Sequence, residues 1–232
     1  MIRKQQIPLD ERLALCASFV REGAMLADVG TDHAYLPVKL ACEGKIRSAV
    51  ACDIRVGPLE NAKNNIMRFG AEDKVSTILS DGLDSVPANS ATDIVMAGMG
   101  GELIAAIIER TPWLYDSSIR LILQPMTRAY MLRSFLCGAG FRIAEEKACV
   151  SGKKCYSVMM CEYDGVKREC SKRFAYIGNI SESDNDASKR YIDTVIFKLK
   201  RKINGLKKSG NQQEAAYYQA VLDEIVSADK LQ

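Results

Sequence analysis

The chain has few of the residues that build metal centres and none of the long apolar runs that cross membranes. Its 232 residues include one histidine, and none of its eight cysteines forms a Cys-x-x-Cys pair. Cysteines in apolar patterns behave as small hydrophobic residues, so we expect reduced, buried thiols and no metal site. No apolar run approaches the roughly 20 residues of a transmembrane helix, and the polar start Met-Ile-Arg-Lys-Gln-Gln lacks the apolar core of a signal peptide. The sequence therefore predicts a cytoplasmic protein with no membrane partner.

Residues 1–163 alternate apolar runs and amphipathic segments in the rhythm of a parallel sheet. Five runs predict parallel strands, and two further runs around Ser151-Gly-Lys-Lys154 predict a hairpin. The expected strands cover residues 24–29, 46–52, 75–79, 93–97, 119–123, 141–150 and 155–163. The first expected helix follows Asp10 and ends at about residue 20. The others cover residues 34–42, 58–70, 101–110 and 128–137. This α/β pattern matches the seven-stranded sheet of methyltransferases.

Residues 164–232 form a second unit of different character. Five apolar residues from Ile192 to Leu206 recur at steps of four and three, and a second such series runs from Ala215 to Ile225. These spacings predict two amphipathic helices that form an antiparallel hairpin of coiled-coil type. Residues 164–185 are expected to be a linker, with helix-capping residues near its end.

The segment Met25-Leu-Ala-Asp-Val-Gly-Thr-Asp-His33 predicts a ligand site. A buried strand ends in Asp28, passes Gly30 and meets Asp32 where a helix should begin. A phosphate-binding turn presents amides without negative charge, whereas two carboxylates suit a cationic ligand rich in amines and hydroxyls. S-adenosylmethionine therefore fits better than a dinucleotide, and no G-x-G-x-x-G motif is present. The alternative is an ordinary corner whose acids only cap the helix.

Three other strand ends add to the predicted cofactor site. Asp53 is placed to accept both ribose hydroxyls, and Asp81 to accept from an adenine amine. The segment Gly98-Met-Gly-Gly101 would let the backbone lie against the cofactor or the target. As ordinary loop residues, these acids and glycines would have no such role. The predicted cofactor contacts are Asp28, Gly30, Thr31, His33, Asp53, Ile54, Asp81, Gly82, Ala97, Gly98 and Met99.

Four segments together resemble a known family: residues 28–37, Ser80-Asp-Gly-Leu83, Ala97-Gly-Met-Gly-Gly101 and Leu121-Ile-Leu-Gln-Pro125. They are similar to the TrmK-type bacterial tRNA (adenine-N1)-methyltransferases, which modify the adenosine at position 22 in the D-stem region of certain tRNAs. The resemblance spans essentially the whole chain. It implies a Rossmann-like catalytic domain, S-adenosylmethionine as donor and tRNA as acceptor.

The resemblance also implies residue roles. The family's important aspartate falls on Asp32, and its tRNA-linked arginine falls on Arg12. Asp53 stands where family members can carry Glu, which keeps the carboxylate. Asp32 could hold the adenine amine and offset the developing charge, or it could cap the helix. His33 could touch phosphate or base and Tyr35 could stack on the flipped base, or both could be structural residues. The Asn/Asp-Pro-Pro-aromatic motif of exocyclic-amine methyltransferases is absent, in agreement with a ring-nitrogen target.

The positive charge is concentrated in the tail. Residues 189–208 hold eight Lys/Arg and one acid, although the whole chain carries only +3. Lys198, Lys200, Arg201 and Lys202 are the predicted phosphate contacts, and a solvated helix face is the alternative. We expect a monomer. Two other functions stay open: methylation of a small molecule or protein, and RNA binding by a non-catalytic protein with a vestigial cofactor fold.

Overall fold

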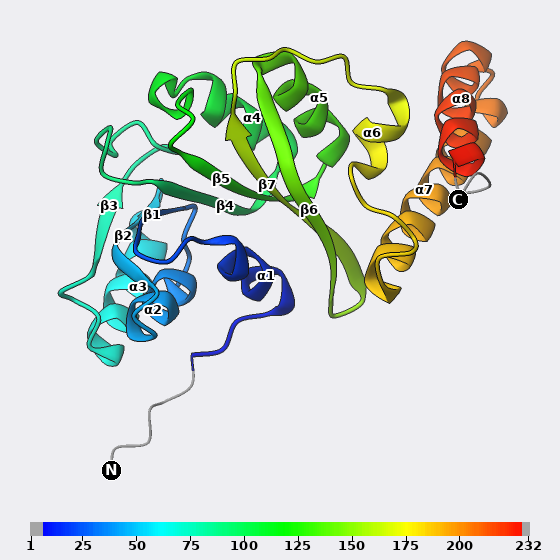
Figure 1. Ribbon diagram of the computed structural model, residues 1–232. Helices are drawn as coiled ribbons and strands as arrows, with labels where there is room; N and C mark the ends of the chain where they lie inside the picture. The colour runs from blue at the N-terminus through cyan, green and yellow to red at the C-terminus, as the bar shows by residue number, and fades with distance from the viewer. Residues whose placement is uncertain (1–6, 229–232) are drawn as a thin grey trace.

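The computed structural model describes residues 7–228, which form a seven-stranded sheet with helices on both faces and a helical hairpin at one end (Figure 1). The sheet order is β3-β2-β1-β4-β5-β7-β6. The first five strands in this order are parallel, and β7 lies antiparallel between β5 and β6. The predicted fold is confirmed. The strands are β1 (Ala24–Val29), β2 (Ile46–Asp53), β3 (Val75–Leu79), β4 (Asp93–Gly100), β5 (Arg120–Thr127), β6 (Phe141–Ser151) and β7 (Lys154–Tyr163).

Two apolar layers cover the two faces of the sheet. Successive side chains of a strand point to opposite faces, so Val95 of β4 packs with one layer while Ile94 and Met96 pack with the other. The helices of the first layer are α1 (Glu11–Phe19), α2 (Tyr35–Cys42) and α3 (Val56–Phe69). Those of the second are α4 (Gly101–Glu109), the short 3-10 helix η1 (Pro112–Leu114) and α5 (Ala129–Ala139). Because both faces are buried, the central strands are continuous apolar runs.

Strands β4 and β5 are longer than the sequence predicts. After a shift in register, Met99 pairs with Pro125 and Gly100 with Thr127. The glycine-rich segment after residue 97 is therefore a continuation of the strand and not a free loop. It is held at the carboxyl edge of the sheet by its neighbour.

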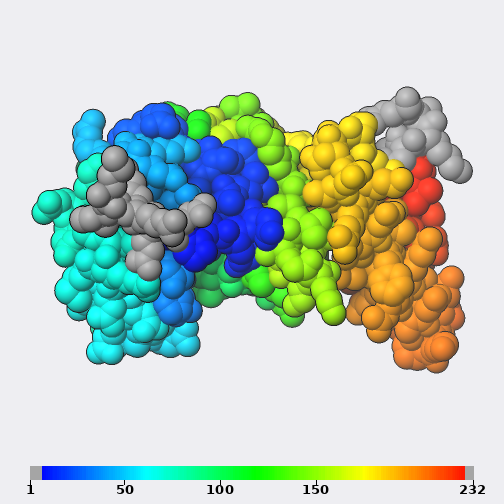
Figure 2. Space-filling view, turned by 90° about the horizontal axis from the view of Figure 1, so that it is seen from below, coloured from blue at the N-terminus to red at the C-terminus, as the bar shows by residue number. Residues whose placement is uncertain are grey.

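The tail has three helices, one more than predicted. The expected linker contains α6 (Lys172–Ile177), which precedes α7 (Asp186–Lys208) and α8 (Gln212–Ala228). The predicted apolar seam is confirmed, because Ile192, Leu199 and Ile203 are buried against residues of α8. The side chain of Asn185 caps α7 by accepting a hydrogen bond from the backbone N–H of Ser188. Seen from below, the tail forms one end of an elongated molecule (Figure 2).

Thiol burial is partly as expected. All eight cysteines are free, and five are buried. Cys42 is exposed, and Cys155 and Cys170 are half-buried, so the expectation of burial is wrong for these three. Within residues 7–228, no helix combines the length and apolar character that a bilayer crossing needs.

A buried ion pair joins the tail to the sheet. Arg133 of α5 donates to Glu146 of β6, with 2.6 Å between Nη2 and Oε1, and both side chains are fully buried. The same guanidinium donates to the backbone oxygens of Ala175 and Tyr176 in α6, at 2.8 and 3.0 Å. It also donates to the Tyr191 hydroxyl of α7 at 2.9 Å. With a further bond to the Ser157 hydroxyl of β7 at 3.1 Å, one side chain links five elements.

Gly178, which ends α6, lies directly against this ion pair. A Cβ atom there would be 1.8 Å from Oε2 of Glu146 and 2.7 Å from Nε of Arg133. Its φ of +65° is also unfavourable for other residues. The backbone N–H of Asn179 then donates to the same glutamate oxygen at 3.2 Å. Only glycine allows the chain to pass this close to the carboxylate.

Replacing Arg133 by Met should lower the free energy of unfolding by about 3–5 kcal/mol, because Glu146 would remain as an uncompensated buried charge. Chemical denaturation followed by circular dichroism measures this. The control is Arg142→Met, which removes an exposed arginine paired with Glu162 and should cost about 1 kcal/mol or less. Equal stability of the two variants would contradict a structural role for the buried pair.

Candidate active site

The candidate site lies where the connections leave the sheet in opposite directions. β1 and β4 are neighbours, but α2 follows β1 onto one face and α4 follows β4 onto the other. Such a switch point opens a crevice at the carboxyl ends of the strands. Gly30 and Gly98, at these two ends, have φ values of +75° and +83°.

The turn after β1 is held against its two neighbours. The backbone N–H groups of Gly30 and Thr31 both donate to the carbonyl of Cys52 in β2, at 2.8 and 2.9 Å. On the β4 side, a Cβ on Gly30 would lie 3.4 Å from Sδ of Met99. The absence of a side chain at Gly30 therefore leaves the backbone open between β2 and β4. The structure brings together the predicted residues Gly30, Thr31 and Met99.

Asp28 is a buried acid directly below this turn. Burial raises its pKa to about 6, and a hydrogen bond from Thr31 opposes the rise. No Lys or Arg pairs with it among the residues that the structure describes. A buried carboxylate without a cationic partner is costly, and a positively charged ligand group would offset this cost. The amino group of S-adenosylmethionine has this chemistry, so the residues present fit that cofactor.

The end of β2 presents a second acid beside an apolar surface. Asp53 is buried, and its Oδ1 accepts from the backbone N–H of Arg55 at 2.8 Å. The next side chain, Ile54, is 61% exposed. An acceptor next to an exposed aliphatic group suits a ribose with an attached planar base.

At the end of β3, the predicted cofactor residues Asp81 and Gly82 contact the C-terminal end of α4 and the residue after it. Asp81 accepts from Arg110, the residue that follows α4, through both its carboxylate and its backbone oxygen, at 2.5 and 2.9 Å. A Cβ on Gly82 would be 2.9 Å from Cγ1 of Ile107. Gly82 thus allows close packing of this turn on α4, a role that the sequence did not reveal.

Asp32 does not cap α2. The helix begins at Tyr35, its cap position is Ala34 with φ of +53°, and the backbone N–H of Ala34 donates to the Thr31 hydroxyl at 3.1 Å. Instead, Asp32 is largely exposed, with Oδ2 3.3 Å from Nε2 of His33. The imidazole stacks on Tyr35 with 5.3 Å between ring centroids. The capping interpretation of Asp32 is wrong, and the three predicted residues Asp32, His33 and Tyr35 form one accessible cluster.

Arg12 lies beside the end of β4. Its Nη1 donates to Oε1 of Gln124 at 2.7 Å, and the same oxygen accepts from the backbone N–H of Gly98 at 3.2 Å. Asp10 holds the other side of the guanidinium at 2.7 Å. Gln124 is fully buried and was not among the predicted site residues. Its place in the motif Leu121–Pro125 was the one hint of a role, although that motif does not show that the amide is buried.

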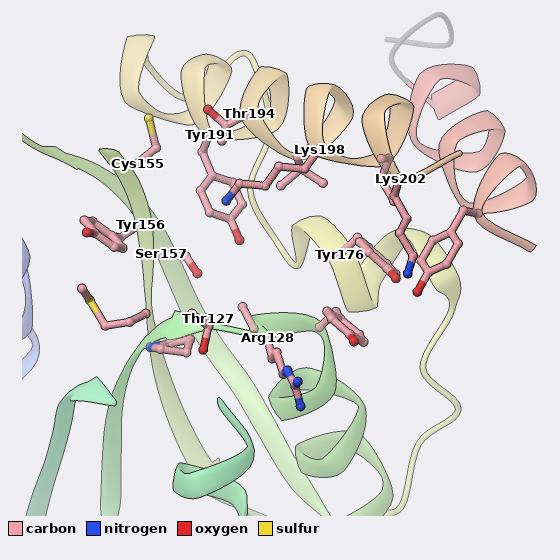
Figure 3. Close-up of a pocket in the computed structure, with 17 residues that line it drawn as sticks. Thr127, Arg128, Cys155, Tyr156, Ser157, Tyr176, Tyr191, Thr194, Lys198 and Lys202 are labelled. Carbon is pink, nitrogen blue, oxygen red and sulfur yellow. The ribbon is translucent and has the colours of Figure 1, made fainter. Parts of the chain in front are cut away.

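Of the basic residues of α7, Lys198, Arg201 and Lys202 line one hollow on the helix surface. Lys198 and Lys202 line a cavity opposite the carboxyl end of β5 (Figure 3). Lys200 is exposed, and the Arg201 guanidinium lies 5.8 Å from the ring centroid of Phe197. Among residues 7–228, no three His, Cys, Asp or Glu side chains form a possible metal site.

Comparisons with known proteins identify the family of the chain. A family model described as a methyltransferase domain matches residues 9–159. The tRNA (adenine(22)-N(1))-methyltransferase of Bacillus subtilis (strain 168) is 34% identical over 168 residues, which are 69% of this chain and 71% of that protein.

Two solved structures have the same fold over nearly the full length. Streptococcus pneumoniae Sp1610 in complex with S-adenosyl-L-methionine is 31% identical with a TM-score of 0.79, covering 94% of this chain and 99% of that one. M. capricolum TrmK in complex with S-adenosyl-homocysteine is 25% identical with a TM-score of 0.77, covering 96% and 98%. The chain belongs to the family of the tRNA (adenine(22)-N(1))-methyltransferases.

Proposed function

We propose that the protein transfers the methyl group of S-adenosylmethionine to N1 of adenosine 22 of tRNA. The observation that carries the proposal is the buried Asp28 beneath the Gly30 turn, at the switch point of the sheet, which has no cationic partner among the residues that the structure describes. The identity with the Bacillus subtilis enzyme supports the substrate. The cytoplasmic location and the monomeric state stay predictions from the sequence.

Residues at different strand ends would bind different parts of the cofactor. With the cofactor bound, Asp28 would face the amino group, Asp53 would accept from the ribose hydroxyls, and Ile54 would pack on the adenine. Asp81 keeps a free carboxylate oxygen besides the one that Arg110 occupies. The backbone at Gly30 and Gly98 allows the donor to approach closely.

The reaction needs orientation more than proton transfer. When bound, the cofactor supplies a sulfonium methyl group that the in-plane lone pair of adenine N1 can attack directly. Formation of the new N–C bond with loss of the S–C bond would leave the adenine cationic. Asp32 is placed to accept from the exocyclic amine and to offset this charge. His33 holds the Asp32 carboxylate on one side, and Asn65 fixes the His33 carbonyl at 3.0 Å.

N1 lies on the pairing edge of adenine, so the base must leave any pair before it reacts. Tyr35 offers a half-exposed ring beside Asp32 on which the base can stack. Arg12, across the crevice at Gly98, is placed for a phosphate of the same strand. We assign residues 1–163 to the catalytic domain, and residues 164–232, the linker and the helical hairpin, to a tRNA-binding appendage.

Transfer of labelled methyl groups to bulk tRNA, followed by nucleoside analysis, tests the proposal. We expect 1-methyladenosine at position 22, and no product when position 22 is guanosine. Cofactor binding without tRNA methylation would favour a small-molecule or protein substrate. Absence of cofactor binding would favour an RNA-binding protein with a vestigial fold.

Asp32→Ala should lower methyl transfer by about 100-fold or more while cofactor affinity is unchanged, because the carboxylate acts on the base. The matched variant Asp53→Ala should instead raise the cofactor dissociation constant about tenfold or more, since the ribose loses a charged acceptor. Calorimetry and single-turnover kinetics separate the two effects. Loss of cofactor affinity in a folded Asp32→Ala protein would place Asp32 among the cofactor ligands.

Cofactor affinity should rise with pH between 5 and 7. The Asp28 carboxyl has a pKa of about 6, so it is mostly neutral at pH 5 and mostly ionised at pH 7. A cationic ligand binds the ionised form, which gives about a tenfold gain over this interval and a plateau above it. Calorimetry should show a flat, weaker profile for Asp28→Asn, whereas His33→Asn should keep the slope. A flat wild-type profile would show that Asp28 does not face a cation.

If the basic centre of α7 contacts phosphates, changing Lys198, Lys200, Arg201 and Lys202 to Gln should weaken tRNA binding. The log–log salt dependence should flatten by up to about 0.9 for each phosphate that the variant no longer neutralises. The charge-matched control changes the other four basic residues of the segment, Lys189, Arg190, Lys207 and Lys208, and should keep most of the slope. Wild-type slopes in both variants would move the RNA footprint to the catalytic domain, near Arg12.

A further inference from the structure

A cavity of about 270 Å³ lies between the tail and the carboxyl end of β5 (Figure 3). Residues 125–130 form its floor, the start of β7 forms one side, and α6, α7 and α8 close the remainder. No residue of the 28–35 turn, all of which the structure describes, lines it. The cavity is therefore separate from the predicted cofactor and target sites.

The lining combines aromatic rings with positive charge. Five tyrosines line the cavity, and two of them, Tyr130 and Tyr176, stack with 4.9 Å between centroids and 5° between planes. Lys198 and Lys202 extend from α7 on the cavity side, and Nζ of Lys202 lies 5.5 Å from the Tyr218 ring centroid. Lys198 has no acidic partner among the described residues, whereas Lys202 pairs with Glu214 at 3.3 Å. Tyrosine faces with nearby ammonium groups suit a ligand that is planar, aromatic and anionic.

The cavity is close to the predicted target site. Its floor residue Pro125 pairs with Met99 at the end of β4. Its wall residue Tyr156 carries the Arg12 guanidinium over its ring, 5.7 Å from the centroid. Arg12 in turn lies 3.9 Å from a Cβ position on Gly98. One strand and one arginine thus separate the two sites, so a single nucleic-acid strand can reach both.

We propose that this cavity binds the base of a second, unpaired nucleotide of the same tRNA, with its phosphate toward Lys198 and Lys202. This inference rests on the proposed function. The volume is below that of sites for drug-sized ligands, so it suits one base and not several. Extruding the target adenine costs unstacking energy, and stacking a second base on tyrosines offsets part of that cost.

The first test fills the cavity. Thr194 of α7 lines the cavity and is half-buried, so Thr194→Trp places an indole where the base would lie. We expect the dissociation constant for a tRNA transcript to rise about tenfold, the scale of one stacked base. Turnover at saturating tRNA and cofactor affinity should stay near wild type. The matched control is Asn204→Trp, which adds the same indole at an exposed position of the same helix outside the cavity lining and should leave all three unchanged.

The second test needs no variant and so does not depend on folding of Thr194→Trp. Cys155 lines the cavity and is half-buried, whereas Cys42 is exposed at the far end of α2. Alkylation by N-ethylmaleimide, followed residue by residue by mass spectrometry, should slow severalfold at Cys155 when tRNA is added. The rate at Cys42 should not change.

Three results would overturn the inference: wild-type tRNA affinity of folded Thr194→Trp, unprotected Cys155 in the tRNA complex, or a loss of turnover without a loss of affinity. The last would make the cavity part of the reacting site. Failure of the proposed function is distinguishable, because the wild-type protein would then not methylate tRNA at all.

Discussion

The buried pair of Arg133 and Glu146 fixes the relation between the tail and the sheet. Both charges are out of water, so their geometry must be maintained by further hydrogen bonds. These bonds come from α6 and α7, and therefore the position of the tail helices is set by the same guanidinium that neutralises the glutamate. This contact, together with the apolar packing of α7 on β6, sets the places of the tyrosine-lined cavity and the basic residues of α7. The sheet and the tail helices are therefore joined to each other, and the hairpin is not loosely attached.

Much of the architecture was predictable because burial leaves a clear pattern. Buried parallel strands are uninterrupted apolar runs, and the α7–α8 seam repeats at helical spacing, so both were readable without a structure. The short helix α6 was not, since six residues give less than two turns of periodicity. The extra length of β4 and β5 was also missed, because Met99 and Pro125 pair only after a shift in register that depends on the neighbouring strand.

The site was predictable to the extent that it follows strand ends. Asp28, Gly30 and Met99 were placed correctly near one another because the carboxyl ends of parallel strands share an edge. Gln124 and Arg133 were missed for one reason: a polar residue in a strand or helix is usually on the solvent side, and nothing in the local pattern shows that it is buried. Only the partners, far away in sequence, reveal this. Asp32 was uncertain for another reason, because the sequence fits both a helix cap and an exposed acid.

The packing of α1 against the last strands has a consequence for synthesis. Arg12 belongs to the first helix, but it reaches its final surroundings only through Gln124 of β5 and Tyr156 of β7. The turn after β1 is predicted to bind the methyl donor, and it lies against β2 and β4. All of these elements have been synthesised once the chain reaches residue 100. Chains emerge N-terminal end first, so the elements that surround the donor are available well before those that surround the nucleic acid. A nascent or truncated chain would have the parts for cofactor recognition while still lacking a complete surface for RNA, which separates the acquisition of the two binding properties in time.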